Sequence, residues 1–208
     1  MRVELHQVAK RYKTEWVLRH VQLSLQAGHA YAITGPNGSG KSTLLKILSG
    51  HLTPTKGQIR FWLQEQPLPT DQVYRHLSYA APYIDLIEEF TLLEALHFQQ
   101  HFKPFLHQHT VADIITLLGL ERARHKPIRH FSSGMKQRLK LALAICADSR
   151  LLLLDEPTAT LDRQGIEWYQ TLIETFRHNQ RLIVVASNVE DDFFFCQQRI
   201  QILDFKNG

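Results

Sequence analysis

Alternating apolar and polar positions predict strands along the amino-terminal part of the chain. Residues 17–25 alternate regularly, a pattern typical of a strand with one buried face. Residues 30–34 form a short apolar strand that runs into a glycine-rich turn. The spacing in 42–48 then predicts a helix that ends at Gly50, and 57–62 predicts another strand. We therefore expect mainly β-structure before the middle of the chain.

The middle of the chain has helical spacing instead. In 92–102 and 111–118, apolar residues recur at the spacing of a helix face, which indicates two amphipathic helices. A third helix is predicted from about residue 135 to 147. Because strand patterns bound this stretch on both sides, we expect a helical insertion within an α/β chain.

Strands made almost entirely of apolar residues return towards the carboxyl terminus. They are predicted at 151–154, 182–186 and 200–203, with a helix at 164–177 between the first two. Apolar strands in a strand–helix–strand order favour a mostly parallel sheet with helices on both faces. The pattern as a whole predicts an α/β fold.

Composition and charge narrow the class of protein. The chain has 208 residues, of which 44% are apolar and 21% are charged, and this is typical of a folded globular protein. The net charge of +4 is modest and spread out, so we expect no nucleic-acid partner. Cys146 and Cys196 lie far apart, which argues against a disulfide framework. No apolar run approaches the ~18 residues of a membrane-spanning helix, and the amino terminus lacks the pattern of a secretory signal.

Residues 35–42 carry the clearest chemical signal. They read Gly-Pro-Asn-Gly-Ser-Gly-Lys-Ser and match the pattern G-x-x-x-x-G-K-[ST] between a predicted strand and a predicted helix. Gly38 and Gly40 allow backbone N–H groups to turn towards phosphate oxygens, and the helix that follows adds the positive end of its dipole. Lys41 is expected to reach the β- and γ-phosphates, and the Ser42 hydroxyl to bind Mg²⁺. The alternative is an ordinary glycine-rich turn, which needs neither the lysine nor the hydroxyl.

Two acids follow the apolar strand at 151–154. Asp155 is placed to hold Mg²⁺, directly or through water. Glu156 is a candidate general base that would accept a proton from an attacking water. Two solvated acids at a strand end are the ordinary alternative, but the phosphate-binding pattern in the same chain favours a shared site.

The chain resembles the nucleotide-binding subunits of ATP-binding-cassette (ABC) transporters over essentially its whole length. Residues 35–43 read GPNGSGKST, 151–162 read LLLLDEPTATLD, and 131–138 read FSSGMKQR at the place of the LSGGQ-x-QR signature. The resemblance implies an ATPase in which Lys41, Glu156 and Asn188 are catalytic. The loop residues that it implies in ATP binding are Gly35, Pro36, Asn37, Gly38, Ser39, Gly40, Lys41, Ser42 and Thr43.

Tyr12 matches a further position of the family. It stands 23 residues before Gly35, where the family places an aromatic side chain that stacks on adenine. The resemblance therefore implies that Tyr12 contacts the base. The alternative is an ordinary surface aromatic at the junction of a strand and a loop.

The signature segment matches the family only in part. Ser132 and Gly134 are kept, whereas Phe131, Ser133 and Met135 depart from the pattern. The small residues precede a helix, so the backbone N–H groups and the Ser132 hydroxyl are able to face an anion. In the family this segment closes over the ATP bound by a second subunit, which implies a dimer during turnover. A plain helix cap is the alternative.

Two residues depart from what the resemblance implies about catalysis. Pro82 falls where the family carries a glutamine that contacts Mg²⁺ and water, and proline offers no side-chain donor or acceptor. Asn188 falls where the family carries a histidine that contacts the γ-phosphate. Asparagine can still donate an amide hydrogen there, but it is shorter and cannot become a cation. We therefore expect slower hydrolysis.

The resemblance implies a fold, an organisation and partners. The fold is a P-loop NTPase core with an amino-terminal antiparallel β part and an inserted helical subdomain. One cassette would span 1–208, with the core and β part at 1–83 and 141–208 and the signature subdomain at 84–140. The implied cofactors are ATP and Mg²⁺, the latter held by Ser42 and Asp155. The implied partners are a separate transmembrane permease and a second cassette, identical or different, at the cytoplasmic face of the cell membrane. The departures at Pro82 and Asn188 leave a weakly hydrolysing regulatory subunit as the alternative.

Overall fold

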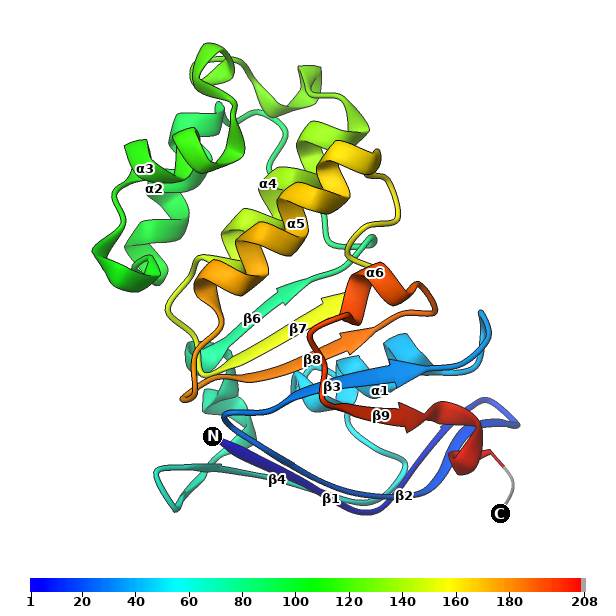
Figure 1. Cartoon of the computed structure of the whole chain (residues 1–208). Helices are drawn as coiled ribbons and strands as arrows, with labels where there is room; N and C mark the ends of the chain where they lie inside the picture. The colour runs from blue at the N-terminus through cyan, green and yellow to red at the C-terminus, as the bar shows by residue number, and fades with distance from the viewer. Residues whose placement is uncertain (207–208) are drawn as a thin grey trace. The chain divides into compact units, whose positions relative to one another are not determined.

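The strands pair into an antiparallel sheet and a parallel sheet in the computed structural model, which describes residues 1–206 (Figure 1). The antiparallel sheet has the order β2-β1-β4-β5, formed by β1 (Arg2–Tyr12), β2 (Glu15–Gln26), β4 (Lys56–Leu63) and β5 (Gln66–Leu68). The parallel sheet has the order β6-β7-β8-β3-β9, formed by β6 (Leu77–Ala80), β7 (Leu151–Asp155), β8 (Leu182–Ala186), β3 (Ala30–Thr34) and β9 (Gln198–Gln201).

The three central strands of the parallel sheet are buried along their whole length. Every residue of β3, β7 and β8 is buried, which explains their nearly continuous apolar sequences. Helix α1 (Lys41–Leu48) packs against β7 and β8, and its Leu44 and Leu45 belong to the same apolar cluster as Leu153 of β7. A short helix, α6 (Glu190–Phe193), follows β8. These contacts fix the starting point of α1 beside the carboxyl ends of the strands.

Contacts divide the chain into two compact units. The first contains residues 1–79, 150–156 and the described chain from 178 onwards, and the second contains 80–149 and 157–177. The boundary predicted between residues 140 and 141 instead falls inside α4 (Ser133–Ile145), a continuous helix of the second unit. The last two residues of the predicted range 141–208 lie outside the described residues.

The second unit is helical, as the apolar spacing predicts. It contains α2 (Leu92–Phe102), α3 (Val111–Leu118), α4 and α5 (Arg163–Phe176). Both α2 and α3 begin with a capping box, formed at α3 by Thr110 and Asp113. The pKa of Asp113 lies below its usual value because the Thr110 backbone N–H and hydroxyl both donate hydrogen bonds to its carboxylate. The sequence therefore defines the start of these helices as well as their buried faces.

The last strand differs from its prediction. The apolar spacing predicts a buried strand at 200–203, but β9 ends at Gln201 and the chain turns into a 3₁₀ helix (Ile202–Phe205). Strand β9 is the edge strand of the sheet and, among the residues that the structure describes, pairs only with β3, so its polar residues tolerate exposure. Ile202 is buried in the apolar core although it lies beyond the end of β9, which is why its apolar character misplaces the prediction.

The α/β fold itself is confirmed. The parallel sheet with its helices, the antiparallel sheet near the amino terminus and the helical insertion all match the predicted fold class. None of the helices within residues 1–206 has both the length and the apolar character needed to cross a membrane.

Candidate functional site

The register of the parallel sheet brings together residues that lie far apart in the sequence. Ala186 of β8 pairs with Ile33 of β3 on one side and with Asp155 of β7 on the other. Because the strands run in the same direction, the segments that follow them leave the sheet at one edge. The phosphate-binding pattern follows β3, and the two predicted acids lie at the end of β7. The sheet therefore gathers the predicted site at its carboxyl edge.

The loop between β3 and α1 needs glycine at defined positions. Gly35 has a φ of 144° and Gly38 a φ of 74°, both in the region that favours glycine. An added Cβ at Gly35 would lie 2.4 Å from Ile202 Cγ2, whereas one at Gly38 would meet no atom within 4 Å. Gly35 is thus required by the packing of the protein itself. The open space at Gly38 leaves room for a ligand to approach the backbone.

Helix α1 begins without a side-chain cap. Its N-cap residue is Gly40, and no side chain within residues 1–206 caps the first turn. The N–H groups of that turn are therefore left for a ligand, at the positive end of the helix dipole. Ser39 Oγ, just before the helix, is buried and forms no hydrogen bond with any described residue. A buried hydroxyl without a partner in the chain is available to a ligand or to a water.

Lys41 is held inside the loop by carbonyl groups. Its Nζ atom donates to Gly35 O at 2.7 Å and to Pro36 O at 3.4 Å, and the side chain is only 5% exposed. Within residues 1–206 it forms no ion pair. A buried ammonium group with neutral partners is a strong attractor for an anion, because an ionised acceptor makes a stronger hydrogen bond than a carbonyl.

The two acids occupy different environments. Asp155 ends β7 and is only 2% exposed, whereas Glu156 is half-buried beyond the strand. Glu156 has a φ of 45°, a left-handed backbone that is unusual for a residue with a Cβ. Its N–H donates to Ala186 O at 2.9 Å, which holds this conformation in place. Strained backbone of this kind concentrates at functional sites, where the surrounding structure maintains it.

Asn188 contacts the phosphate-binding loop directly. Its Oδ1 atom accepts a hydrogen bond from Gly35 N at 2.9 Å. The residues on either side of it are fixed by Ser187, whose buried hydroxyl donates to Asp192 and accepts from Val189 N at 3.0 Å. The Ser187–Asp192 pair could not be predicted from the sequence, because its only signal is a serine and an aspartate that follow an apolar strand.

Tyr12 lies at the carboxyl end of β1. The side chain is 45% exposed, and Lys10 Nζ lies 5.4 Å from the centre of the ring. The hairpin of β1 and β2 adjoins the phosphate-binding loop, since Val17 of β2 lies next to Gly40. The ring is therefore available to a ligand, and its stacking on adenine stays a prediction.

The signature residues lie in the second unit. Ser132 is the N-cap of α4, and its Oγ accepts a hydrogen bond from Met135 N at 3.2 Å. The helix begins at Ser133, slightly before its predicted start. Gly134 is open on its side-chain face, where an added Cβ would meet only Thr160 O, at 3.8 Å. The helix-cap interpretation of Ser132 is confirmed, whereas binding of a partner's ATP by Ser132 and Gly134 stays a prediction.

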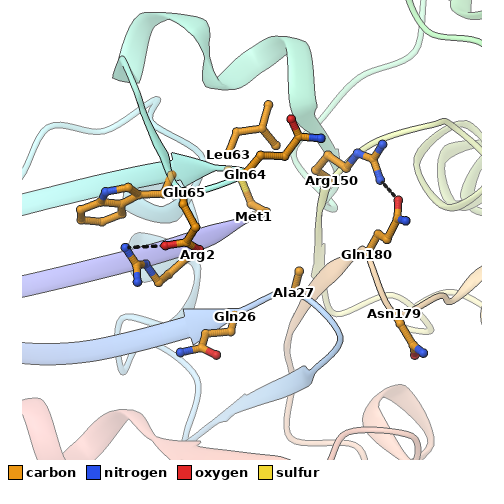
Figure 2. Close-up of a pocket in the computed structure, with 11 residues that line it drawn as sticks. Met1, Arg2, Gln26, Ala27, Leu63, Gln64, Glu65, Arg150, Asn179 and Gln180 are labelled. Carbon is orange, nitrogen blue, oxygen red and sulfur yellow. Dashed lines mark hydrogen bonds and ion pairs between the residues drawn. The ribbon is translucent and has the colours of Figure 1, made fainter.

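A cavity of about 450 Å³ lies at the opposite edge of the parallel sheet (Figure 2). Arg150 and Gln180, which precede β7 and β8, line it and are hydrogen-bonded to each other. Arg2 also lines it, lies 3.5 Å from Glu65 and stacks on Trp62. None of the predicted site residues lines this cavity, and its two arginines, Arg2 and Arg150, are partnered by other residues of its wall. It is therefore separate from the candidate site.

Comparison with known proteins identifies the family. Residues 18–159 match the family model described as ABC transporter, and this range is more than half of the chain. The chain therefore belongs to the ABC transporter family, whose nucleotide-binding members are generally ATPases.

Curated relatives cover most of the chain. The lantibiotic transport ATP-binding protein SrtF of Streptococcus pyogenes is 31% identical over 192 residues, which are 90% of this chain and 80% of that protein. The cytochrome c biogenesis ATP-binding export protein CcmA of Xylella fastidiosa is 33% identical over 164 residues, which are 79% of this chain and 76% of that protein. This chain is thus similar to ATP-binding components of transporters.

Solved structures confirm the cassette fold. An ATP-binding subunit of an ABC transporter superposes with a TM-score of 0.81 at 24% identity, covering 97% of this chain and 87% of that one. The cassette MJ0796, in a dimeric post-hydrolysis state bound to ADP and Pi, superposes with a TM-score of 0.80 at 23% identity, covering 96% and 94%.

The two loop glycines should respond differently to the same substitution. Gly35→Ala adds a Cβ against Ile202 and should lower the free energy of unfolding by about 2–4 kcal/mol. Gly38→Ala adds only backbone strain and should lower it by about 1–2 kcal/mol. Urea denaturation of the two variants measures both effects, and equal losses would contradict the packing role assigned to Gly35.

Proposed function

We propose that this chain binds ATP at the carboxyl edge of the parallel sheet, hydrolyses it, and drives a separate membrane permease through ATP-dependent closure of a dimer of cassettes. The convergence of Lys41, Glu156 and Asn188 on one sheet edge supports this proposal most strongly. Membership of the ABC transporter family supports it independently.

The loop and Lys41 would bind the phosphates. The uncapped first turn of α1 supplies N–H donors, and the open face of Gly38 lets the phosphates approach the backbone. Lys41 would exchange the carbonyl oxygens of Gly35 and Pro36 for phosphate oxygens. The exchange is favourable because the new acceptors are charged and the ammonium group is already largely out of water.

Ser42 and Asp155 form a donor set that suits Mg²⁺. Both offer oxygen ligands, and α1, which contains Ser42, packs against β7, which ends in Asp155. Within residues 1–206, no group of three or more His, Cys, Asp or Glu is arranged to hold a metal ion, so phosphates and water would complete the coordination. A bound Mg²⁺ would neutralise part of the charge on the phosphates.

Glu156 would act as the general base. It directly follows Asp155, and its left-handed backbone is fixed by the hydrogen bond to Ala186 O. A carboxylate at this position would accept the proton of an attacking water and so raise its nucleophilicity. The peptide preceding Glu156 is held by the sheet, which limits the reorganisation needed during the reaction.

The second cassette and the permease are proposed from the relatives. Ser132 is exposed at the start of α4, where N–H groups and a hydroxyl are available to an anion. The structure of MJ0796 is described as a dimer bound to ADP and Pi, which supports a sandwich of two cassettes here. SrtF and CcmA are described as ATP-binding proteins of transport or export, which supports a separate permease at the cytoplasmic face of the membrane.

A weakly hydrolysing subunit of a heterodimer is the second candidate function. Pro82 has no polar side chain at the position of the family's glutamine, and its carbonyl accepts from Lys140 Nζ at 3.2 Å. Asn188 replaces the family's histidine, and its oxygen is already engaged by Gly35. The steady-state ATPase rate of the purified chain, alone and with a second cassette, separates this candidate from a fully active homodimer.

Tyr12→Ala should weaken the binding of ATP more than the binding of a ligand that lacks a base. Stacking acts on adenine alone, so we expect a loss of about 1–3 kcal/mol for MgATP and no loss for Mg-tripolyphosphate. Isothermal titration calorimetry measures both affinities, and Tyr74→Ala, at another exposed tyrosine, is the matched control. Equal losses for the two ligands would show that Tyr12 does not contact the base.

Glu156→Gln should separate ATP binding from hydrolysis. The amide keeps the size of the side chain but cannot accept the proton of water, so turnover should fall by about 10²–10⁴-fold while ATP still binds. Because bound ATP joins two cassettes, size-exclusion chromatography with MgATP should show a species near twice the 24.2 kDa of the monomer. Glu121→Gln, at an exposed glutamate, should retain the wild-type rate. A Glu156→Gln protein with wild-type turnover would contradict the assignment of the base, and an inactive one that stays monomeric would point to a different cassette as partner.

A further inference from the structure

Side chains from two segments hold Gly35 on both sides. Asn188 Oδ1 accepts from Gly35 N at 2.9 Å, and Lys41 Nζ donates to Gly35 O at 2.7 Å. We infer that Asn188 is a positioning residue that anchors the first glycine of the phosphate-binding loop, before and independently of any contact with a γ-phosphate. The inference rests on the proposed ATP site, because it assigns Asn188 a role in that site.

The register of the sheet explains why residues 188 and 35 meet. Ile33 of β3 pairs with Ala186 of β8, and each chain continues for two further residues beyond this pair. In parallel strands, equal steps from a paired position keep residues side by side. The hydrogen bond from Ser187 N to Ile33 O, at 3.1 Å, extends the ladder beyond the last pair. The side chain of Asn188 therefore lies beside the backbone of Gly35.

Hydrogen bonds of the Ser187 hydroxyl restrain the segment that contains Asn188. Ser187 is buried, and its hydroxyl donates to the buried carboxylate of Asp192. Val189 N donates to the same hydroxyl at 3.0 Å, so the backbone on each side of Asn188 is restrained. A side chain on a restrained backbone loses little conformational freedom when it makes its hydrogen bond. The Asn188 side chain is therefore placed to accept a hydrogen bond from Gly35 without a change in its backbone.

The chemistry of the hydrogen bond fixes which end of the amide faces the loop. A backbone N–H only donates, so the carbonyl oxygen of Asn188 must point at Gly35 and its NH₂ group must point elsewhere. At the position of the family's histidine, this chain thus carries an asparagine whose Oδ1 atom accepts a hydrogen bond from the loop. A contact with the γ-phosphate would use the donor end, and the two roles are chemically separable.

The hydrogen bond between Gly35 and Asn188 matters most when Lys41 no longer contacts Gly35. In the structure, Lys41 and Asn188 restrain Gly35 together. When Lys41 turns to the phosphates, the hydrogen bond that Gly35 N donates to Asn188 Oδ1 would still restrain Gly35. Because Lys41 would meet the β-phosphate of ADP as well as ATP, loss of the anchor should weaken both nucleotides equally. A residue that contacts only the γ-phosphate would affect ATP alone.

Two substitutions at position 188 separate the acceptor from the donor. Asn188→Leu keeps the size and removes both, whereas Asn188→Asp keeps an acceptor for Gly35 N and removes the donor. In nucleotide-free protein labelled with ¹⁵N-glycine, the Gly35 amide should exchange about three- to tenfold faster in Asn188→Leu than in the wild type. In Asn188→Asp it should remain protected. ADP and ATP affinities of Asn188→Leu, measured by calorimetry, should fall together by a similar factor.

Two results would overturn the inference. One is a Gly35 amide that is equally protected in Asn188→Leu and the wild type. The other is an Asn188→Leu protein that binds ADP normally and loses only ATP affinity or turnover, since that result assigns Asn188 to the γ-phosphate. Should Asn188→Leu fail to fold, Asn188→Ala at this exposed position supplies the same comparison.

Lys41→Ala distinguishes failure of the inference from failure of the proposed function. If Lys41→Ala bound nucleotide as tightly as the wild type, this result would contradict the proposed ATP site itself. The exchange of the Gly35 amide is measured without nucleotide, so it still reports on the Asn188 anchor in that case.

Discussion

The parallel register of β3, β7 and β8 is the constraint on which the candidate site depends. Ala186 pairs with Ile33 on one side and Asp155 on the other, so the three strands end level with one another. A shift of one strand by a single residue would exchange the side chains on its two buried faces, and the close packing against both faces opposes such a shift. The packing of the apolar core thereby determines where the residues of the candidate site lie. Gly35, Glu156 and Asn188 are each held by hydrogen bonds at this edge because the register delivers them there.

The buried ammonium group of Lys41 is the main electrostatic feature of the loop. Its hydrogen bonds go to the carbonyl oxygens of Gly35 and Pro36. A nucleotide therefore has to compete with these carbonyls, and its affinity reflects the difference between charged and neutral acceptors. The same exchange changes the restraints on Gly35, where Asn188 supplies the second contact. Binding of phosphate and the conformation of the loop are thus linked through one residue.

Much of the fold and of the loop could be predicted from sequence, because the signals are local. The strands at 30–34 and 182–186 match their predictions, since each is a short apolar run with clear limits. Lys41 lies at the start of α1 as the glycine-rich pattern predicts, and Ser132 caps α4. These features need only the spacing of a few neighbouring residues.

Features that depend on strand order could not be predicted in the same way. The bond between Asn188 and Gly35 joins segments 153 positions apart and requires β8 to lie beside β3. The strand predicted at 200–203 extends too far because Ile202 is buried in the apolar core although it lies beyond the end of β9. The left-handed backbone of Glu156 has no sequence signal either, since glutamate normally avoids it. Each of these is a consequence of tertiary packing.

The most direct test of the account is a titration of ¹⁵N-glycine-labelled protein with MgATP, followed by nuclear magnetic resonance. The chain has 10 glycines, so each amide signal can be assigned by substitution. We expect the signals of Gly35, Gly38 and Gly40 to shift together and saturate. The signals of Gly28, which precedes β3 at the other edge of the sheet, and Gly57 in β4 should not move. Loop glycine signals that stay fixed at saturating MgATP would contradict the account.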